Sequence, residues 1–301
     1  MAQDFTPDNV MLYQQPDGSI PDDYNNLILG DIIENSRVMQ LGVYEDMDGQ
    51  EKKFDYFANG IGAYWVDEGE KIQTTKPTLL QVTMRAKKLG VILVASREYL
   101  NYSLPQFFEV MRPKIAEAFY RKFDEAAILD VDNPFTQSIE GSITESGKVV
   151  EGDLNYENIM LVEDLLLEDD VEANGFISKS QNVTQLRQAR LTENGVSDVL
   201  FDRASNTLDG LPVTNLKSGE FPKGRLYAGD FDSLRYGIPY NINYRVSEDA
   251  QLSTVTNPDG SPVNLYEQEL IAIRATMDVG LMLVKDEAFA KIEPATDPEG
   301  A

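Results

Sequence analysis

The sequence predicts an α+β fold with an extended rather than a globular shape, and three features lead to that prediction. In residues 271–283 every odd position is apolar, which predicts a strand of roughly 40 Å, about twice the usual length. Residues 104–128 place apolar side chains on one helical face, which predicts a helix of roughly 37 Å. Between residues 43 and 94, two strand-like patterns are separated by about twenty polar residues, so a long hairpin should project from the body.

Local signals mark the ends of the first elements. Residues 1–22 combine three prolines with little periodicity and predict an extended arm. A short amphipathic helix is expected next, with Gly42 as its end. For the long helix, Ser103 and Gln106 form a capping box, and Pro113 is expected to kink or split the helix.

The second half of the chain alternates helix-like and strand-like patterns. Two helices are predicted from NYENIMLVEDLLL and SQNVTQLRQAR, and three strands from ANGFISK, LDGLPVTNL and GRLYAGDF. This alternation is typical of a separate compact unit. A further strand over residues 236–246 is joined to the long strand by a polar loop that contains an Asn-Pro-Asp-Gly turn.

Composition argues against catalysis. The 301-residue chain has no cysteine and no histidine, so it lacks thiolate nucleophiles, imidazole bases and the usual zinc ligands. Carboxylate pairs and oxygen ligands for hard cations remain open. The sequence contains no GxxxxGK[ST], GxGxxG or HExxH motif. We therefore expect a protein that is not an enzyme and has no cofactor.

Two acidic stretches have a cation-binding alternative. The stretch Asp130-Val-Asp132-Asn133 alternates oxygen ligands but lacks the glycine and the closing glutamate of a calcium loop. The run Glu168-Asp169-Asp170 has the oxygens for a divalent cation, although solvation of a helix end is the simpler interpretation. We expect no metal site.

Charge is large and unevenly distributed. The formal net charge is −25, and such a field repels phosphate, so sequence-specific DNA binding is not expected. Residues 76–122 contain nine Lys or Arg against three acids, and residues 151–172 contain nine acids and no base. Each stretch is either a solvated face or one of two oppositely charged faces that meet, within the chain or between copies.

The sequence also bears on location. No apolar run approaches the ~18 residues that cross a bilayer. The N-terminus lacks the basic and apolar regions of a secretory signal. We therefore expect no membrane partner and a cytosolic site of synthesis.

Six blocks follow one another along the chain: AYWVDEGEKI, KKLGVILVASREYL, FDEAAIL, LDGLPV, YAGDFDSLRYGI and LIAIRATMDVGLMLVKDEAFAKI. In this order they resemble the major capsid proteins of tailed phages with the Hong Kong 97-type fold, over nearly the whole chain. The resemblance is closest to siphoviruses of Gram-positive hosts, of the staphylococcal helper phage type. It implies a major capsid protein whose pentamers and hexamers form an icosahedral shell around double-stranded DNA.

The resemblance divides the chain into the segments of that fold. They are an N-arm (1–25), the N-terminal helix and strand of the peripheral domain (26–46), the E-loop (47–86), the peripheral domain with its spine helix (87–150), the axial domain (151–233), the long peripheral strands and tip loop (234–277), and the return to the axial domain with a C-terminal tail (278–301).

The resemblance also implies partners. A portal protein would occupy one vertex of the virion capsid, which would be assembled in the host bacterial cytoplasm. Because no long N-terminal delta region is present, a separate scaffolding protein is expected, unless a leader has already been removed. Some relatives link an E-loop lysine covalently to an asparagine of a neighbour. Here the candidates are Lys71 or Lys76 with Asn257 or Asn264, and we expect no such link.

The only tryptophan, Trp65, lies beside Tyr64 in the most polar part of the predicted hairpin. We expect this aromatic pair to anchor in an adjacent subunit, as interface hot spots do, and packing against the chain's own helix is the alternative. The other residues expected at contacts between subunits are charged: Lys71, Lys76, Arg85, Lys87, Lys88, Arg112, Lys114, Arg121, Lys122, Glu168, Asp169 and Asp170.

Three other functions remain as alternatives. An encapsulin-type compartment protein would share the fold and would need a groove for its cargo. A carboxylate-dependent hydrolase would need two inward carboxylates roughly 5 to 9.5 Å apart in a cleft. Another virion component, such as a tail protein, would lack the axial-domain blocks.

Overall fold

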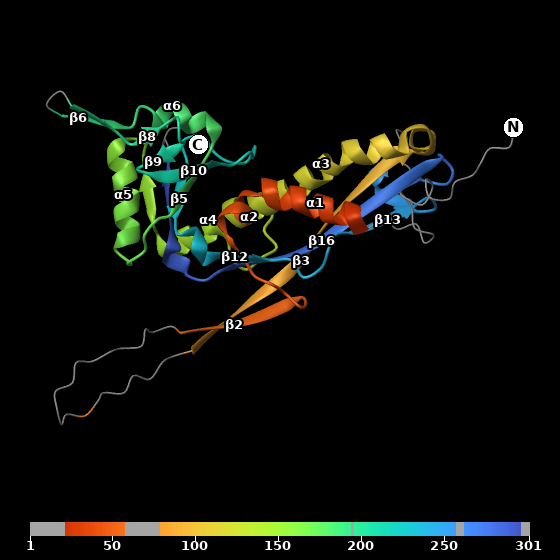
Figure 1. Cartoon of the computed structure of the whole chain (residues 1–301), viewed down its shortest axis with the longest axis horizontal. Helices are drawn as coiled ribbons and strands as arrows, with labels where there is room; N and C mark the ends of the chain where they lie inside the picture. The colour runs from red at the N-terminus through yellow and green to blue at the C-terminus, as the bar shows by residue number, and fades with distance from the viewer. Residues whose placement is uncertain (1–21, 58–70, 72–78, 194–195, 257–261, 296–301) are drawn as a thin grey trace.

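The computed structural model describes residues 22–57, 71, 79–193, 196–256 and 262–295, which form an elongated molecule with two main sheets (Figure 1). A six-stranded sheet carries three helices along one face, and we call this part the long-sheet unit. A seven-stranded sheet lies at one end of the molecule, and we call this part the seven-stranded unit.

The strands of the long sheet run in the order β1-β12-β16-β3-β2, and β13 pairs with the other end of β16. All neighbours are antiparallel except the pair β1 and β12. The strands are β1 (Val43–Tyr44), β2 (Glu51–Phe57), β3 (Leu79–Ser96), β12 (Leu234–Gly237), β13 (Asn243–Ser247) and β16 (Leu270–Leu283).

The two longest strands, β16 and β3, are hydrogen-bonded without a register shift from the pair Leu270 and Ser96 to the pair Leu281 and Arg85. The odd residues of β16 from 271 to 283 are all buried in the largest core, together with side chains of the helices. The long strand predicted from the alternation of apolar residues is therefore confirmed.

The long sheet is covered on different faces at its two ends. Near the hairpin, Met84 and Ala86 of β3 pack with Met47 and Met282 in a small separate cluster. From Leu89 onward, the odd residues of β3 pack against the large core instead. Strand β3 pairs with β16 without a bulge, so its side chains alternate strictly between the two faces of the sheet. The buried apolar residues change from even positions (Met84, Ala86) to odd positions (from Leu89), and this change marks the point where the other face of the sheet becomes covered.

The large core of the long-sheet unit lies between this sheet and three helices, which are α1 (Asp22–Asn35), α2 (Arg37–Leu41) and α3 (Arg97–Leu129). In Figure 1, α3 runs alongside the long strands and α1 lies against it. None of the helices in the described residues is both long and apolar enough to cross a bilayer.

Two expectations about α3 are wrong. The helix does not begin at a capping box at Ser103, because β3 ends at Ser96 and α3 follows it directly. Pro113 does not split the helix, which is continuous for 33 residues. Pro113 is exposed, so the carbonyl that loses its helical partner can bond to water, and packing of the flanking turns on the sheet holds the helix together.

The seven-stranded sheet has the order β4-β17-β11-β5-β10-β9-β8. Its strands are β4 (Val149–Glu151), β5 (Gly175–Ser178), β8 (Phe201–Asp202), β9 (Thr207–Leu208), β10 (Leu211–Asn215), β11 (Leu226–Gly229) and β17 (Phe289–Glu293). The strand after β16 thus enters the sheet of the other unit, between β4 and β11.

Both faces of the seven-stranded sheet are buried. Phe176 and Ala228 face a core that includes α5 (Tyr156–Leu167), whereas their neighbours Ile177 and Tyr227 face the large core, where α4 (Ile139–Ser146) lies. Burial on both faces explains why every residue of β5 and β11 is buried and why most of them are apolar.

One predicted helix of this unit is mostly absent. The stretch SQNVTQLRQAR contains only a 3-10 turn, η2 (Ser180–Asn182), and a single helical turn, α6 (Val183–Leu186). The chain is then extended from Arg190, where β6 (Arg190–Glu193) pairs with β7 (Val196–Val199). Two other 3-10 turns are η3 (Phe231–Ser233) and η4 (Asp286–Ala288).

A small ribbon completes the long-sheet unit. Strands β14 (Gln251–Thr256) and β15 (Pro262–Asn264) pair antiparallel, and Leu252 and Val263 pack with Ala272 of β16. The predicted Asn-Pro-Asp-Gly turn between these strands lies outside the described residues.

Candidate assembly surfaces

The aromatic anchor predicted in the hairpin cannot be placed. Tyr64, Trp65 and Lys76 lie outside the described residues, and Lys71 is exposed. Of the two asparagines considered for a covalent link, Asn257 also lies outside them. The side-chain oxygen of Asn264 accepts a hydrogen bond from the backbone N–H of Tyr266 at 3.2 Å. Both the aromatic anchor and the absence of a covalent link therefore remain predictions.

The cations of β3 lie on the surface near the base of the hairpin. Arg85 forms an ion pair with Glu51 of β2 at 3.0 Å, and both side chains are more than half exposed. Lys87 and Lys88 are exposed and, in the described part of the chain, form no ion pair. They rim an apolar hollow of about 230 Å³ whose wall includes Phe135. This part of the basic stretch is thus available to a partner.

The cations in the second half of α3, from Arg112 to Lys122, are instead paired within the chain. The Nε and Nη2 atoms of Arg112 donate to the two carboxylate oxygens of Asp31 at 2.7 and 2.8 Å, which fastens α1 to α3. Lys122 binds Asp132 at 2.6 Å, and this contact lowers the pKa of the Asp132 carboxyl. Lys114 and Arg121 pair with glutamates one turn along the helix, at 3.3 Å and 3.2 Å.

The acidic residues after α5 are exposed. Asp169 accepts an ion pair from Lys148 at 2.7 Å, and the Lys148 side chain is only 8% exposed. Glu168 and Asp170 form no ion pair with other described residues. In the part of the chain that the structure describes, no group of three or more acidic side chains is arranged to hold a metal ion.

An apolar row lies on the face of the long sheet that points away from α3. Ile92 and Val94 of β3 are 49% and 37% exposed. Ile92 pairs with Arg274 of β16, which in turn pairs with Arg245 of β13, and both arginines are exposed. Branched apolar side chains beside cations make a surface suited to a protein partner.

A buried carboxylate that the sequence analysis missed joins α3 to α2. Asp124 is 2% exposed and accepts hydrogen bonds from the Ser36 hydroxyl at 2.6 Å, the Arg37 N–H at 2.8 Å and the Val38 N–H at 3.2 Å. Burial raises the pKa of Asp124 to about 6, and these hydrogen bonds act in the opposite direction. Its position in the apolar stretch FDEAAIL is the signal that was available.

The next residue on α3 reaches the seven-stranded unit. Glu125 accepts from the Ser218 hydroxyl at 2.6 Å and from Arg121 at 3.2 Å. On the same side, the Nε of Arg37 donates to the carbonyl of Asn215 at 3.1 Å. Consecutive acids therefore connect α3 to both α2 and the other unit.

A second polar network joins α4 to the seven-stranded sheet. Glu140 of α4 accepts from the Tyr227 hydroxyl and from Lys291, both at 2.8 Å, and lies 3.4 Å from Arg225. Glu293 binds Lys291 at 2.8 Å and Arg225 at 3.0 Å. Burial raises the pKa of Tyr227, while the two cations lower that of Glu293. The two acids and two bases balance in charge, which fits a structural role.

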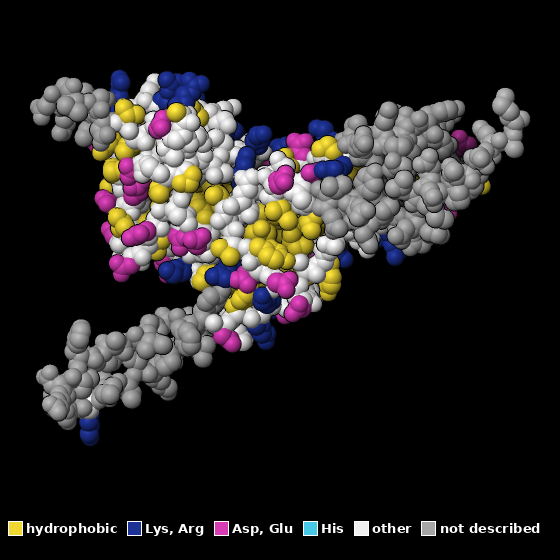
Figure 2. Space-filling model, in the orientation of Figure 1, with side chains coloured by type: hydrophobic (Ala, Val, Ile, Leu, Met, Phe, Trp, Pro, Cys, Tyr) yellow, Lys and Arg dark blue, Asp and Glu magenta, His cyan; other side chains and the backbone are white. Residues whose placement is uncertain are grey.

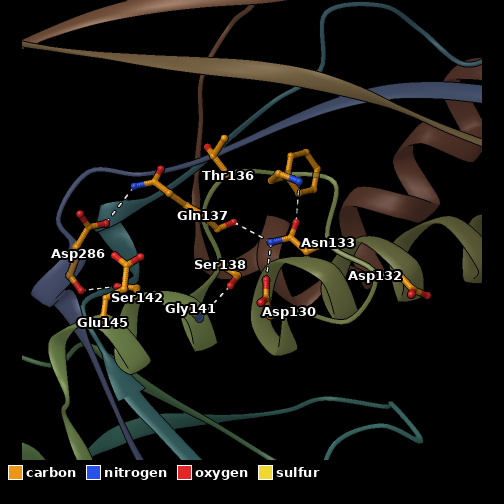
Figure 3. Close-up of a pocket in the computed structure, with 11 residues that line it drawn as sticks. Asp130, Asp132, Asn133, Thr136, Gln137, Ser138, Gly141, Ser142, Glu145 and Asp286 are labelled. Carbon is orange, nitrogen blue, oxygen red and sulfur yellow. Dashed lines mark hydrogen bonds between the residues drawn. The ribbon is translucent and has the colours of Figure 1, made fainter.

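The large polar hollow shown in Figure 3 lies where the two units join. It has a volume of about 480 Å³, and its wall is built from the loop after α3, from α4 and from η4. Gln137 donates to Asp286 at 3.0 Å and also bonds both backbone groups of Leu283. Asn133 donates to Asp130 at 2.7 Å, so these polar groups already have structural partners.

Comparison of the sequence with known proteins assigns the chain to one class of protein. The model of the phage capsid family matches residues 18–293. The chain is 53% identical to the major capsid protein of Staphylococcus phage 80alpha over 97% of its length and 90% of that protein. It is 26% identical to the probable major capsid protein gp17 of Mycobacterium phage L5, over 80% of this chain and 78% of that one.

Solved structures agree on the fold. A chain of Mycobacterium phage Adephagia superposes with a TM-score of 0.70 at 15% identity, covering 99% of this chain and 96% of that one. A chain of Microbacterium phage Oxtober96 gives a TM-score of 0.67 at 18% identity, over 86% and 91%. These are capsids of the Hong Kong 97 type, and the expected α+β capsid fold is confirmed.

The chain belongs to the phage capsid family, whose members are structural proteins and not enzymes. Its function is that of a major capsid protein of a tailed phage, and its place is the virion capsid. Proteins of this class assemble with copies of themselves into a shell, so other copies of the chain are its partners.

Proposed function

We propose that copies of this chain assemble as pentamers and hexamers into an icosahedral shell that encloses the double-stranded DNA of a tailed phage. The observation that carries the assembly step is the apolar row of Ile92 and Val94, which one copy leaves exposed on the long sheet. The described chain is also elongated, and β2 and the start of β3 project from its body, so one copy leaves much of its surface to others (Figure 1). The long-sheet unit would be the peripheral domain, and the seven-stranded unit the axial domain.

The charges support an assignment of contacts. Because the cations in the second half of α3 are paired within the chain, we propose that Lys87 and Lys88 supply the basic contact between copies. The net charge of −25 supports a shell that encloses DNA without sequence-specific binding. The family resemblance supports a separate scaffolding protein, a portal protein at one vertex and assembly in the host cytoplasm.

Substitution at Ile92 tests the assembly step. The purified chain, alone and with a candidate scaffolding protein, is examined by negative-stain electron microscopy and sedimentation. Ile92→Asp should leave the circular dichroism spectrum unchanged, because the side chain is half exposed, but should prevent shell formation by burying a charge at the contact. Ile92→Val is the matched control and should assemble normally. Shells formed by Ile92→Asp in normal yield would contradict the proposed contact.

A further inference from the structure

Helix α5 buries one apolar face but also exposes two leucines away from it. Ile159, Val162 and Leu166 are fully buried against the seven-stranded sheet. Away from that face, on different sides of the helix, Leu161 and Leu167 are 49% and 53% exposed. A helix that only covered its own sheet would present polar side chains there.

Acids flank the exposed Leu161. Glu157, Asp164 and Glu168 recur with Leu161 at spacings of three and four residues, so all four lie in one stripe along the helix. The three carboxylates are exposed and, among the described residues, have no cationic partner. We call these four residues the α5 stripe.

A basic hollow lies elsewhere on the same unit. Thr184, Arg187, Gln188 and Arg190 line a hollow of about 320 Å³ that begins at α6, and we call it the arginine hollow. Both arginines are exposed, and in the described part of the chain neither forms an ion pair. The chain has 51 acids for 26 bases, so two neighbouring arginines without a carboxylate are unusual. Figure 2 shows basic side chains over α6 and acidic ones along α5.

The two surfaces cannot meet within one chain, because α5 lies along one side of the unit and α6 at its end (Figure 1). A two-fold contact that placed the stripe on a second stripe, or the hollow on a second hollow, is also excluded, because it would bring like charges together. A head-to-tail contact, in which the stripe of one copy meets the hollow of the next, pairs opposite charges at every interface. Repeated around an axis, such a contact closes a ring.

We propose that the α5 stripe of one copy binds the arginine hollow of the next copy around the ring. This inference rests on the proposed function, because it names the surfaces through which the seven-stranded units of the shell meet. Asp164 and Glu168 would accept hydrogen bonds from the guanidinium groups of Arg187 and Arg190, a geometry that suits planar carboxylates. Leu161 would be the apolar anchor within this polar contact.

A charge exchange tests the proposal in the full chain. One variant carries Arg187→Glu and Arg190→Glu, a second carries Asp164→Lys and Glu168→Lys, and a third carries all four substitutions. Each two-site variant should give about tenfold fewer shells or worse, because like charges then face each other. The four-site variant should recover most of the yield, because opposite charges are again paired at every contact. Failure to recover, with both two-site variants folded and defective, would overturn the proposal, as would normal assembly of both.

Mixing the two defective variants gives a sharper result. One carries two basic surfaces and the other two acidic surfaces, so contacts form only where the variants alternate. Alternation closes a ring of six copies but not a ring of five. The mixture should therefore form hexamers and open sheets or tubes, and closed shells from the mixture would overturn the head-to-tail arrangement.

Controls separate this inference from the proposed function. Glu145→Lys makes the same charge change as the reversal of Glu168, on α4 on the other face of the sheet, and should assemble normally. Circular dichroism checks that each variant is folded, and Arg187→Gln with Arg190→Gln replaces a reversal that does not fold. Absence of shells from the unsubstituted chain would sink the proposed function. If the unsubstituted chain forms normal shells but the four-site variant does not recover the yield, the contact between stripe and hollow is wrong and the proposed function stands.

Discussion

Removal of the Asp124 carboxylate should destabilise the chain more than removal of any surface acid. In the substitution Asp124→Ala, the Ser36 hydroxyl and the N–H groups of Arg37 and Val38 lose their common acceptor. Ser36 is fully buried and begins α2, so the change weakens both the start of that helix and its attachment to α3.

The magnitude follows from the number of donors and their burial. A buried donor left without a partner costs about 1–3 kcal/mol. Arg37 is only half-buried, so water can replace the acceptor for its N–H. The Ser36 hydroxyl and the Val38 N–H are then left as two buried donors without an acceptor, so the free energy of unfolding should fall by about 2–6 kcal/mol. For a chain of this size the melting temperature should drop by on the order of 10 °C.

The assay is thermal unfolding of the unassembled chain at pH 8, followed by circular dichroism, where Asp124 is ionised. Asp132→Asn is the control, because it removes the charge of an exposed acid that pairs with Lys122 and keeps a residue that tolerates the left-handed backbone there (φ 48°). Its melting temperature should match that of the unsubstituted chain. A melting temperature for Asp124→Ala within about 2 °C of the unsubstituted value would refute the argument.

Three further outcomes follow from the same structure. The pKa of Asp124 is raised from 3.8 to about 6 on folding, so this carboxyl lowers stability as pH rises through that window. The free energy of unfolding of the unsubstituted chain minus that of Asp124→Asn should fall by roughly 2 to 2.5 kcal/mol between pH 4 and 7, and a constant difference would disprove it. Tyr227→Phe removes the hydroxyl that donates to Glu140, and urea unfolding should show a loss of about 1–2 kcal/mol, with no loss counting against the network. Gly229→Ala would place a methyl group 2.6 Å from the Ala288 carbonyl oxygen, so little soluble protein should be recovered. Gly219→Ala would make only an ordinary contact, 3.7 Å from the Nη2 of Arg121, and should be recovered normally.

The periodic elements could be predicted because their signal is local. The strict alternation of residues 271–283 predicts β16, and a run of apolar residues at helical spacing predicts most of α3. The start of α3 could not be predicted, because the local pattern at Ser103 gives no information on where β3 ends, and in the structure α3 follows β3 directly at Arg97. The helix expected over SQNVTQLRQAR failed for a related reason, since its last residue is held as a strand by the hairpin partner Val199.

The surfaces of the candidate site depend on contacts between distant residues, and only part of them could be predicted. The sequence shows a basic and an acidic stretch, but the structure decides that Arg112 is used within the chain by Asp31, 81 residues away. It also decides that Lys87 and Lys88 stay exposed.

The sequence by itself determined the repeating geometry of this chain, because alternation and helical spacing are properties of neighbouring residues. The sequence also shows where the covered face of the long sheet changes, because the apolar residues of β3 move from even to odd positions after Ala86. Only the tertiary structure decided which helix covers each face and which charges are left for other copies. The physical reason is that burial and ion pairing act through space, between residues whose separation along the chain carries no signal.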